Sequence, residues 1–370
     1  SAIIKMNISI IGLPRSGKTT IFNAATRGKA SVSEFSSKSK PNIGVAKVPD
    51  SRLDRLADIF NPKKITQSEV TYIDIPPTLE TTNPNQGISG EYLAQLQKAD
   101  VLIIVARAFE NPSVPDNGDG VDPSRDTETV LFELTFVDLE ILERRLIRIQ
   151  ENLKGSKSTD RDRLEREMEL IAVLRKNLEN GNPIRSQSLT AEQEKLIEGF
   201  RFLTAKPVII VANISETDLN NTKEFENNLY SHLKEKQILI TSLCGKLEME
   251  LAQMDPEDEK DFRTSLLAGE SGLDRMIRLS YEALNQLTFF TCGPEEVRSW
   301  AVKKGVTAPQ ASGKIHTDME RGFIRAEVVA YNDIIRCKRM AEARNQGVLR
   351  LEGKSYVVQE ADVMLILFNL

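Results

Sequence analysis

The sequence has few of the residues that build disulfide scaffolds, zinc sites or histidine-based catalytic sites. Its three cysteines, Cys244, Cys292 and Cys337, lie far apart and show no metal-ligand spacing. We therefore expect reduced thiols in a reducing compartment. Of the two histidines, we interpret His232 as a solvated helix residue. We interpret His316 as a structural residue or a partner contact, because no nucleophile pairs with it in the sequence.

Long apolar runs and a broad positive charge are absent as well. No apolar run approaches the roughly 20 residues that a membrane helix needs, and residues 1–6 are too short for a signal peptide. The formal net charge is -5, so any contact with nucleic acid has to come from a local basic patch. We therefore predict a cytoplasmic protein without a membrane-embedded part.

The composition that is present suits a soluble globular protein of two or three domains, with 28% charged and 40% hydrophobic residues among 370. Short β-rich runs are separated by helical patterns, and these runs span residues 7–11, 70–75, 101–105, 207–213 and 237–242. Strands that alternate with helices predict an α/β sheet with right-handed crossovers.

The stretch from residue 126 to residue 203 interrupts this alternation with helical periodicity. Apolar residues step by three and four in two stripes, which are Leu139, Leu142, Leu146, Ile149 and Leu153, then Leu164, Met168, Ile171, Leu174 and Leu178. Such stripes predict an antiparallel helical hairpin of the coiled-coil type. Thr190 and Gln193 form a capping box that begins a third helix. We interpret the block as an inserted helical domain.

The sequence after about residue 284 predicts a small β-rich module of about 85 residues. Residues 287–291, 324–330 and 363–368 have strand-like patterns. We interpret Pro294–Ala301 as a helix, because proline is favoured in the first helical turn.

A phosphate-binding loop is the strongest motif, Gly12-Leu-Pro-Arg-Ser-Gly17-Lys18-Thr19, placed between a strand and a helix. Its glycines let backbone N–H groups surround a phosphate at a helix N-terminus. Lys18 is expected to reach the β- and γ-phosphates and to carry the catalytic role. A chance glycine turn is the alternative, and the flanking strand, helix and Thr19 argue against it.

Two oxygen ligands for Mg²⁺ follow from this motif. The hydroxyl of Thr19 is expected to bind the ion directly. Asp74 ends the second strand, where an aspartate holds Mg²⁺ through water; the alternative is an aspartate that caps the next turn. The whole set of loop residues expected to contact the nucleotide is Pro14, Arg15, Ser16, Gly17, Lys18, Thr19 and Thr20.

The base-binding motif departs from that of GTPases, which select guanine with Asn-Lys-x-Asp at the end of a sheet strand. The matching place here reads Asn213-Ile214-Ser215-Glu216, so that glutamate stands where aspartate would accept two hydrogen bonds from guanine.

With this motif the chain resembles the Obg-like ATPase family, the YchF-type proteins, over essentially its whole length. Further similar segments are residues 41–53, 244–248, 288–297, 314–328 and 351–359. In that family Asn-x-x-Glu goes with a preference for ATP. The resemblance implies that Asn213 and Glu216, with Cys244 and Gly245 in the loop beside the base, bind the adenine of ATP, with Mg²⁺ as cofactor.

The resemblance also implies the domain organisation and the partner. It implies a Ras-like P-loop G domain over residues 1–125 and 204–284, an inserted helical coiled-coil domain over 126–203, and a β-grasp-like TGS domain over 285–370. It implies association with the ribosome or its RNA through the helical and TGS domains, and we expect a monomer. Local basic stretches around Arg144, Arg298 and Arg336 fit such contacts, although ordinary helix-surface charge is the alternative.

The chain departs from its family in both switch regions. Pro76 and Pro77 follow Asp74 where the family has a glycine that offers an N–H to the γ-phosphate, and proline has no N–H. Lys38 falls near the position of the usual Mg²⁺-binding threonine, and Ser36, Ser37 or Ser39 are the alternative sources of a hydroxyl.

Two functions follow, and they differ in turnover. Thr78 is not the glutamine that orients the attacking water in Ras-like GTPases, so hydrolysis should be slow. The first hypothesis is a slow ATPase that signals to the translation machinery. The second is a nucleotide-binding regulator or scaffold with little or no hydrolysis, motivated by Pro77 and Lys38. A GTP-specific switch would need aspartate at Glu216.

Overall fold

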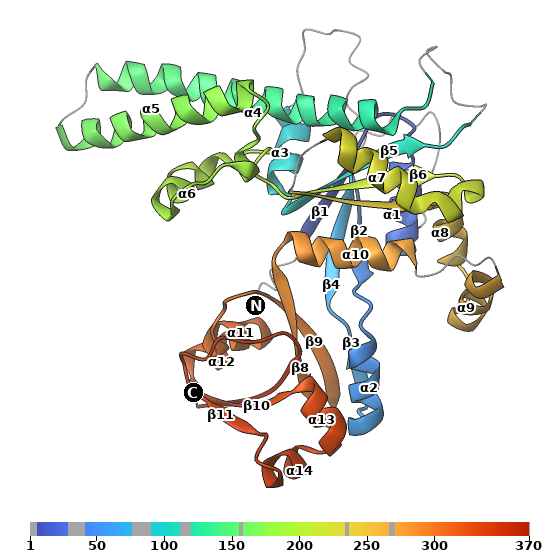
Figure 1. The fold of residues 1–370 in the computed structure, drawn as a ribbon. Coiled ribbons are helices and arrows are strands. Elements are labelled where there is room, and N and C mark those ends of the chain that lie inside the picture. Colours follow the sequence, from blue (N-terminus) through green and yellow to red (C-terminus); the bar gives the residue numbers. More distant parts are fainter. Residues whose placement is uncertain are drawn as a thin grey trace. The chain divides into compact units, whose positions relative to one another are not determined.

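The structure is a computed structural model that describes residues 6–28, 41–75, 90–111, 120–154, 158–233, 237–265 and 271–369. The chain divides into two compact units, each made of separate stretches of the sequence. Figure 1 draws the chain with colours that follow the sequence. The P-loop unit consists of Asn7–Gly44 and Tyr72–Met276, and the C-terminal unit consists of Ser1–Met6, Val45–Thr71 and Ile277–Leu370. Within the described ranges, no helix is long and apolar enough to cross a membrane.

The P-loop unit is built on a six-stranded sheet in the order β2-β4-β1-β5-β6-β7. Its strands are β1 (Asn7–Ile11), β2 (Asn42–Lys47), β4 (Glu69–Asp74), β5 (Val101–Ala108), β6 (Val208–Ile214) and β7 (Ile238–Leu243). The pairs β1–β5, β5–β6 and β6–β7 are parallel. Every residue of β6 is buried, as expected for a strand covered on both faces. The predicted α/β sheet is confirmed.

Helices cover this sheet and lead away from its strand ends. The helices of this unit include α1 (Lys18–Thr26), α3 (Gly90–Lys98), α7 (Thr222–Leu233), α8 (Gly245–Leu251) and α9 (Pro256–Ser265), with 3₁₀ helix η3 at Glu216–Asn221. Helix α10 (Gly272–Ala283) begins in this unit and ends in the C-terminal unit. Apolar residues of β5, β6 and β7 form one core with α3, α7 and α8. Parallel strands connected by helices bring the carboxyl ends of β1, β4 and β6 to one edge, where ligands of such sheets bind.

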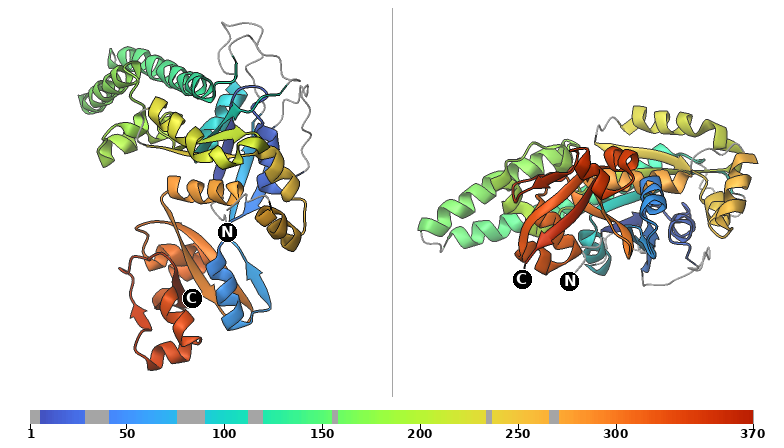
Figure 2. Two further views of the ribbon diagram at one scale, coloured as in Figure 1. Left: turned by 45° about the vertical axis from the view of Figure 1, so that its right-hand side comes forward. Right: turned by 90° about the horizontal axis from the view of Figure 1, so that it is seen from below.

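Two long helices, α4 (Pro123–Leu153) and α5 (Ser158–Glu179), lie side by side in Figures 1 and 2. The first half of α4 contributes Val130 and Leu134 to the core of the sheet. Its second half contributes Leu142 and Ile149 to a separate core shared with α5. The predicted capping box at Thr190 begins α6 (Ala191–Ile197), and η1 (Ile184–Ser186) and η2 (Glu198–Phe200) flank it.

A buried carboxylate lies on α4 between its two cores. Both oxygens of Asp138 accept hydrogen bonds, from the backbone N–H of Leu203 at 2.9 Å, and from the N–H and hydroxyl of Thr204 at 2.7 Å each. Burial raises the pKa of Asp138 to about 6, against the opposing effect of these hydrogen bonds. Asp138 therefore ties α4 to the segment that enters β6.

The C-terminal unit is built on a second six-stranded sheet, in the order β11-β10-β12-β8-β9-β3. Its strands are β3 (Lys64–Thr66), β8 (Gln286–Cys292), β9 (Glu296–Lys303), β10 (Phe323–Ala330), β11 (Arg350–Glu352) and β12 (Asp362–Phe368). Its helices are α2 (Ser51–Phe60), α11 (Ala308–Ile315), α12 (Thr317–Arg321), α13 (Tyr331–Cys337) and α14 (Met340–Asn345). Helix α11 shares one core with the sheet, and α2, α13 and α14 share another.

The interpretation of Pro294–Ala301 as a helix is wrong. These residues lie mostly in β9, which pairs antiparallel with β8. Val297 and Val302 are buried in opposite cores, so the apolar residues follow the period of two that a strand requires. Pro294 lies in the turn before the strand and begins no helix.

The segment between β2 and β4 groups with the C-terminal unit, although the sequence analysis placed it in the G domain. Leu53 and Leu56 of α2 are fully buried against the second core, and β3 pairs in parallel with β9. Helix α2 has one apolar face, which needs a partner, and it finds Phe290 and Val297. The three-domain boundaries stay a prediction.

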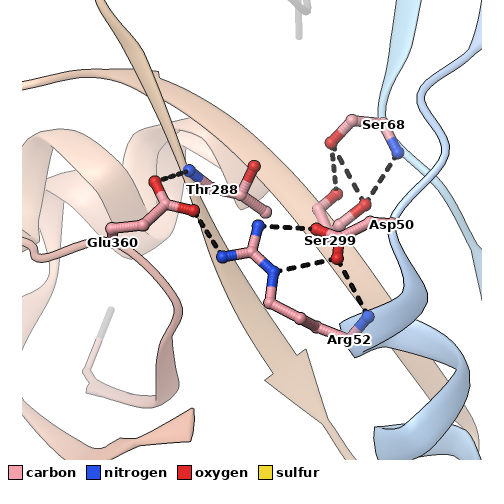
Figure 3. Close-up of polar contacts among 6 residues, drawn as sticks. All are labelled: Asp50, Arg52, Ser68, Thr288, Ser299 and Glu360. Carbon is pink, nitrogen blue, oxygen red and sulfur yellow. Dashed lines mark hydrogen bonds and ion pairs between the residues drawn. The ribbon is translucent and has the colours of Figure 1, made fainter. Parts of the chain in front are cut away.

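A polar cluster around Arg52, drawn in Figure 3, joins α2 to β8 and to the chain before β12. The Arg52 guanidinium donates to both oxygens of Asp50, at 2.9 and 2.8 Å, and to Glu360 at 2.6 Å. Glu360 accepts a second bond from the backbone N–H of Thr288 at 3.0 Å. We call Asp50, Arg52, Thr288 and Glu360 the Arg52 cluster.

Candidate nucleotide-binding site

The loop between β1 and α1 has a backbone that requires both of its glycines. Gly12 and Gly17 have φ angles of 148° and 96°, and a Cβ atom on Gly17 would lie 2.1 Å from Nδ2 of Asn213. A Cβ atom on Gly12 would lie 2.4 Å from the carbonyl oxygen of Val105. No side chain caps the start of α1 at Gly17. The N–H groups of the first turn of α1 therefore suit the binding of an anion at the loop.

Lys18 lies across this loop. Its side chain is buried, and its ammonium donates to the carbonyl oxygens of Gly12 at 3.0 Å and Leu13 at 2.7 Å. Burial lowers the pKa of Lys18 to about 8, and the nearby carboxylate of Asp74 partly opposes this effect. The loop therefore holds a cationic group where a phosphate is expected.

The predicted Mg²⁺ ligands Thr19 and Asp74 are brought together. The hydroxyl of Thr19 donates to Oδ2 of Asp74 at 2.8 Å, and Nδ2 of Asn42 donates to the same oxygen at 3.1 Å. The other oxygen, Oδ1, is buried and has no hydrogen-bond partner among the described residues. A hydroxyl beside a carboxylate with an unpartnered oxygen fits the oxygen ligands that Mg²⁺ prefers.

Asn213 connects the two loops that the sequence analysis assigned to phosphate and base. Its Nδ2 donates to the carbonyl oxygen of Ser16 at 3.0 Å, and its Oδ1 accepts from the backbone N–H of Gly245 at 2.9 Å. The side chain is buried at the end of β6. These contacts fix the start of α8 beside the phosphate loop.

Glu216 and Lys246 form an ion pair at the exposed side of these loops. Oε1 of Glu216 lies 3.1 Å from Nζ of Lys246, and the two side chains are 48% and 68% exposed. The hydrogen bond to Glu216 raises the pKa of Lys246. Cys244 precedes α8 as a buried free thiol, and burial raises its pKa. Glu216 follows Asn213 by three residues, so the buried contacts of Asn213 fix the start of the loop that carries Glu216.

The remaining predicted residues divide into two groups. Pro14 is exposed on the loop, and Arg15 and Thr20 are half-buried. Ser16 is buried, and its hydroxyl oxygen has no hydrogen-bond partner among the described residues. The switch residues Ser36, Ser37, Lys38, Ser39, Pro76, Pro77 and Thr78 lie outside the described residues, so the roles given to them stay predictions.

Two residues of this site were not named from the sequence. Asn42 is the first residue of β2, and Lys246 is the second residue of α8. Each is a single polar residue at the start of an element, and each meets its partner only through the fold. The position of Lys246 directly after Cys244 and Gly245 was the one available signal.

The two histidines lie in exposed polar contacts. Nε2 of His232 is 3.1 Å from Glu128, and Nδ1 of His316 accepts from the backbone N–H of Asp318 at 3.2 Å, which caps α12. The N-cap contact agrees with the structural role expected for His316.

Two family models match the chain. A model of the "50S ribosome-binding GTPase" domain covers residues 7–133. The YchF-GTPase C-terminal model, described as "Protein of unknown function (DUF933)", covers residues 286–369. The two models therefore match opposite ends of the chain.

Full-length relatives extend this similarity. The chain is 37% identical to the "Ribosome-binding ATPase YchF" of Bacillus subtilis (strain 168), over 98% of this chain and 99% of the relative. It is 39% identical to the protein of the same name from Haemophilus ducreyi, over 97% and 98%. The solved structure of the Schizosaccharomyces pombe YchF GTPase has a TM-score of 0.85 and 28% identity, over 98% and 97%.

Proposed function

The chain belongs to the YchF family, and from this premise we propose that it binds ATP with Mg²⁺ and hydrolyses it slowly to ADP and phosphate. The observation that supports the proposal most directly is the arrangement of Lys18, Thr19 and Asp74 around the loop of Gly12–Thr19. A cationic group, a hydroxyl and a carboxylate with an unpartnered oxygen converge on the place where the phosphates are expected.

In this proposal the phosphates are held by the N–H groups of the loop and by Lys18, which exchanges its carbonyl partners for phosphate oxygens. Thr19 and Asp74 hold Mg²⁺, which when bound would neutralise charge on the β- and γ-phosphate oxygens. Asn213 keeps the loop and the start of α8 in place. The turnover is slow, because the chain has Thr78 where a water-orienting glutamine would stand.

Preference for ATP over GTP is the second part of the proposal. It is supported by Glu216 in place of the guanine-selecting aspartate and by the printed names of the bacterial relatives, which are ATPases. The Schizosaccharomyces pombe relative is called a GTPase, so the preference needs a direct measurement. Competition between ATP and GTP decides it, and tenfold tighter binding of GTP would contradict the proposal.

The third part is the partner. Because the relatives are named ribosome-binding, we propose a cytoplasmic monomer that associates with the ribosome through its helical insertion and its C-terminal TGS domain. Arg144 and Arg148 are exposed one turn apart on α4 and are candidate phosphate contacts. Their neighbour Arg145 is engaged by Glu167 at 2.7 Å, and Arg298 stacks on Trp300 at 3.9 Å.

The test is a phosphate-release assay on the full chain, with and without ribosomes. Wild-type protein is expected to release phosphate slowly and to do so faster with ribosomes. Lys18→Ala should abolish release, whereas Lys223→Ala, which removes an exposed lysine of α7, should leave it unchanged. Release that survives Lys18→Ala would mean that the activity arises elsewhere.

The alternative function is a nucleotide-binding regulator or scaffold with little or no hydrolysis. Pro76 and Pro77, two and three residues after Asp74 in the sequence, favour it, because proline cannot donate the N–H expected there. Measurable ATP binding without phosphate release, in the presence of ribosomes as well, would establish the alternative over the ATPase.

A further inference from the structure

The two loops that carry the base-binding residues are joined at two levels. At the buried level, Asn213 holds the carbonyl of Ser16 and the N–H of Gly245. At the exposed level, Glu216 and Lys246 form an ion pair at 3.1 Å. The buried contacts fix the backbone of both loops, so the ion pair requires only the ordering of two side chains.

We propose that Lys246 is a specificity-determining residue of the base site, because its ion pair with Oε1 of Glu216 holds an ammonium donor beside the carboxylate that would face the base. The inference rests on the proposed function, which places the base beside Asn213 and Glu216. In this arrangement Lys246 contacts the base itself, and Glu216 holds its ammonium group in position.

The chemistry of the two bases gives this arrangement its direction. Guanine presents two adjacent donors, N1–H and the N2 amino group, and a carboxylate that selects guanine accepts from both. Adenine presents one amino group, N6, beside an acceptor, N1. A carboxylate with an ammonium donor beside it matches adenine, whereas the same ammonium would meet the N1–H donor of guanine, and a donor left unpaired is costly when it is desolvated.

Lysine adds a second element to the match. An ammonium group has three donors and no acceptor, so Lys246 can bind Glu216 and still donate to the N1 acceptor of adenine. The N1–H of guanine offers no lone pair to that group. The pair therefore contributes both an attraction to adenine and a mismatch with guanine.

The size of the effect is limited by exposure. Both side chains are about half exposed or more, and exposed ion pairs contribute little and weaken as salt rises. We therefore expect a shift of about two- to fivefold in the ratio of GTP to ATP affinity, not a complete exchange of specificity.

The experiment measures dissociation constants of the full chain for non-hydrolysable ATP and GTP analogues with Mg²⁺. Lys246→Ala is expected to raise GTP affinity relative to ATP by about two- to fivefold, and Lys246→Arg, which retains the ion pair, should keep the wild-type ratio. If Lys246 had a purely structural role, the substitution would weaken the binding of both nucleotides equally. In a Glu216→Ala background, Lys246→Ala should change the ratio less than it does in the wild type, because Glu216 no longer holds the ammonium group in place.

Failure of this inference is distinguishable from failure of the proposed function. If the wild-type chain prefers ATP and Lys246→Ala leaves the ratio unchanged, the role of Lys246 is overturned and the proposed function stands. If the wild-type chain prefers GTP, the assignment of Glu216 to adenine falls, and the inference falls with it. A change of the same size in the Glu216→Ala background would also overturn the inference, since Lys246 would then act independently of Glu216.

Discussion

The nucleotide site, which consists of the phosphate loop and Asp74, and the Arg52 cluster both contain polar side chains in partly or fully buried positions. They differ in how completely those polar groups form hydrogen bonds. In the first region, Oδ1 of Asp74 and the hydroxyl of Ser16 are buried without a hydrogen-bond partner among the described residues. In the second, each carboxylate oxygen of Asp50 and Glu360 accepts a hydrogen bond (Figure 3).

This difference separates a binding site from a structural joint. Buried polar groups in folded proteins are almost always paired, so unpaired ones call for a specific explanation, and a role in binding an ion or ligand is one. The paired groups of the Arg52 cluster need no such addition. Substitutions in the phosphate loop should therefore change ligand binding, and substitutions in the Arg52 cluster should change stability.

The largest expected effect comes from Asp74→Asn, which replaces the carboxylate with a neutral group of the same shape. We expect Mg²⁺-dependent affinity for an ATP analogue to fall by about tenfold or more, because a charged oxygen ligand is lost. The free energy of unfolding should change little, since Oδ1 of Asp74 has no hydrogen-bond partner among the described residues to lose. Titration calorimetry at several Mg²⁺ concentrations and thermal unfolding measure the two quantities.

Asp54→Asn provides the control, because this carboxylate is exposed on α2 and should affect neither measurement. The contrast between the two regions would break if Asp74→Asn destabilised the fold and left the Mg²⁺ dependence of binding unchanged. Asp74 would then be a structural residue like Asp50.

A smaller effect, on stability and not on ligand binding, is expected from Arg52→Ala. The change removes the guanidinium from Asp50 and Glu360 and from the ring of Phe290, which it covers at 5.4 Å. We expect the C-terminal unit to lose about 1–2 kcal/mol of unfolding free energy, with most of it from the well-covered Asp50 contact. Glu360 is 52% exposed, so its pair with Arg52 contributes less.

Two measurements on this variant sharpen the contrast. Denaturant unfolding reports the loss of stability, and nucleotide affinity should equal that of the wild type. Arg336→Ala serves as the matched control, because Arg336 is 61% exposed in an ion pair with Asp333, and it should cost no more than about 0.5 kcal/mol. A stability loss as small as that of the control would mean that the Arg52 cluster does not hold α2.

The sequence was sufficient for the nucleotide site where its residues are contiguous or end a buried strand. Lys18 and Thr19 belong to one motif, and Asp74 and Asn213 end strands that a parallel sheet brings to one edge. It was insufficient for Asn42, which meets Asp74 only through the fold. The helix predicted for the residues of β9 was wrong, because the preference of proline for a first helical turn was given more weight than the alternation that places Val297 and Val302 in opposite cores.

The grouping of the segment around α2 shows the same limit on a larger scale. This segment lies between two strands of the P-loop sheet, and sequence proximity assigns it there. The apolar face of α2 instead packs against Phe290 and Val297, more than two hundred residues away. Ser68 of the same segment forms hydrogen bonds with Ser299. Tertiary packing of an amphipathic helix decides its neighbours, and periodicity alone does not identify them.

The smallest expected effect concerns Asp138, a buried carboxylate that is fully paired but accepts all its bonds from neutral donors. Its pKa in the folded chain is about 6, whereas an unfolded aspartate has a pKa of about 3.9. The folded state therefore binds the proton more tightly. The cost of burying the charge is fully present above about pH 6 and is relieved as the pH falls toward 4.

As the pH falls from 7 to 5, this single group should add about 1 kcal/mol to the stability of the contact between α4 and the segment that enters β6. Asp138→Asn removes the titration, so the variant should lack this part of the pH dependence even though it loses acceptors at every pH. Hydrogen exchange at the amides of Leu203 and Thr204, corrected for the intrinsic rate, measures the stability of this contact directly. Equal pH dependence in both proteins would show that three hydrogen bonds from neutral donors suffice to keep this buried carboxylate charged.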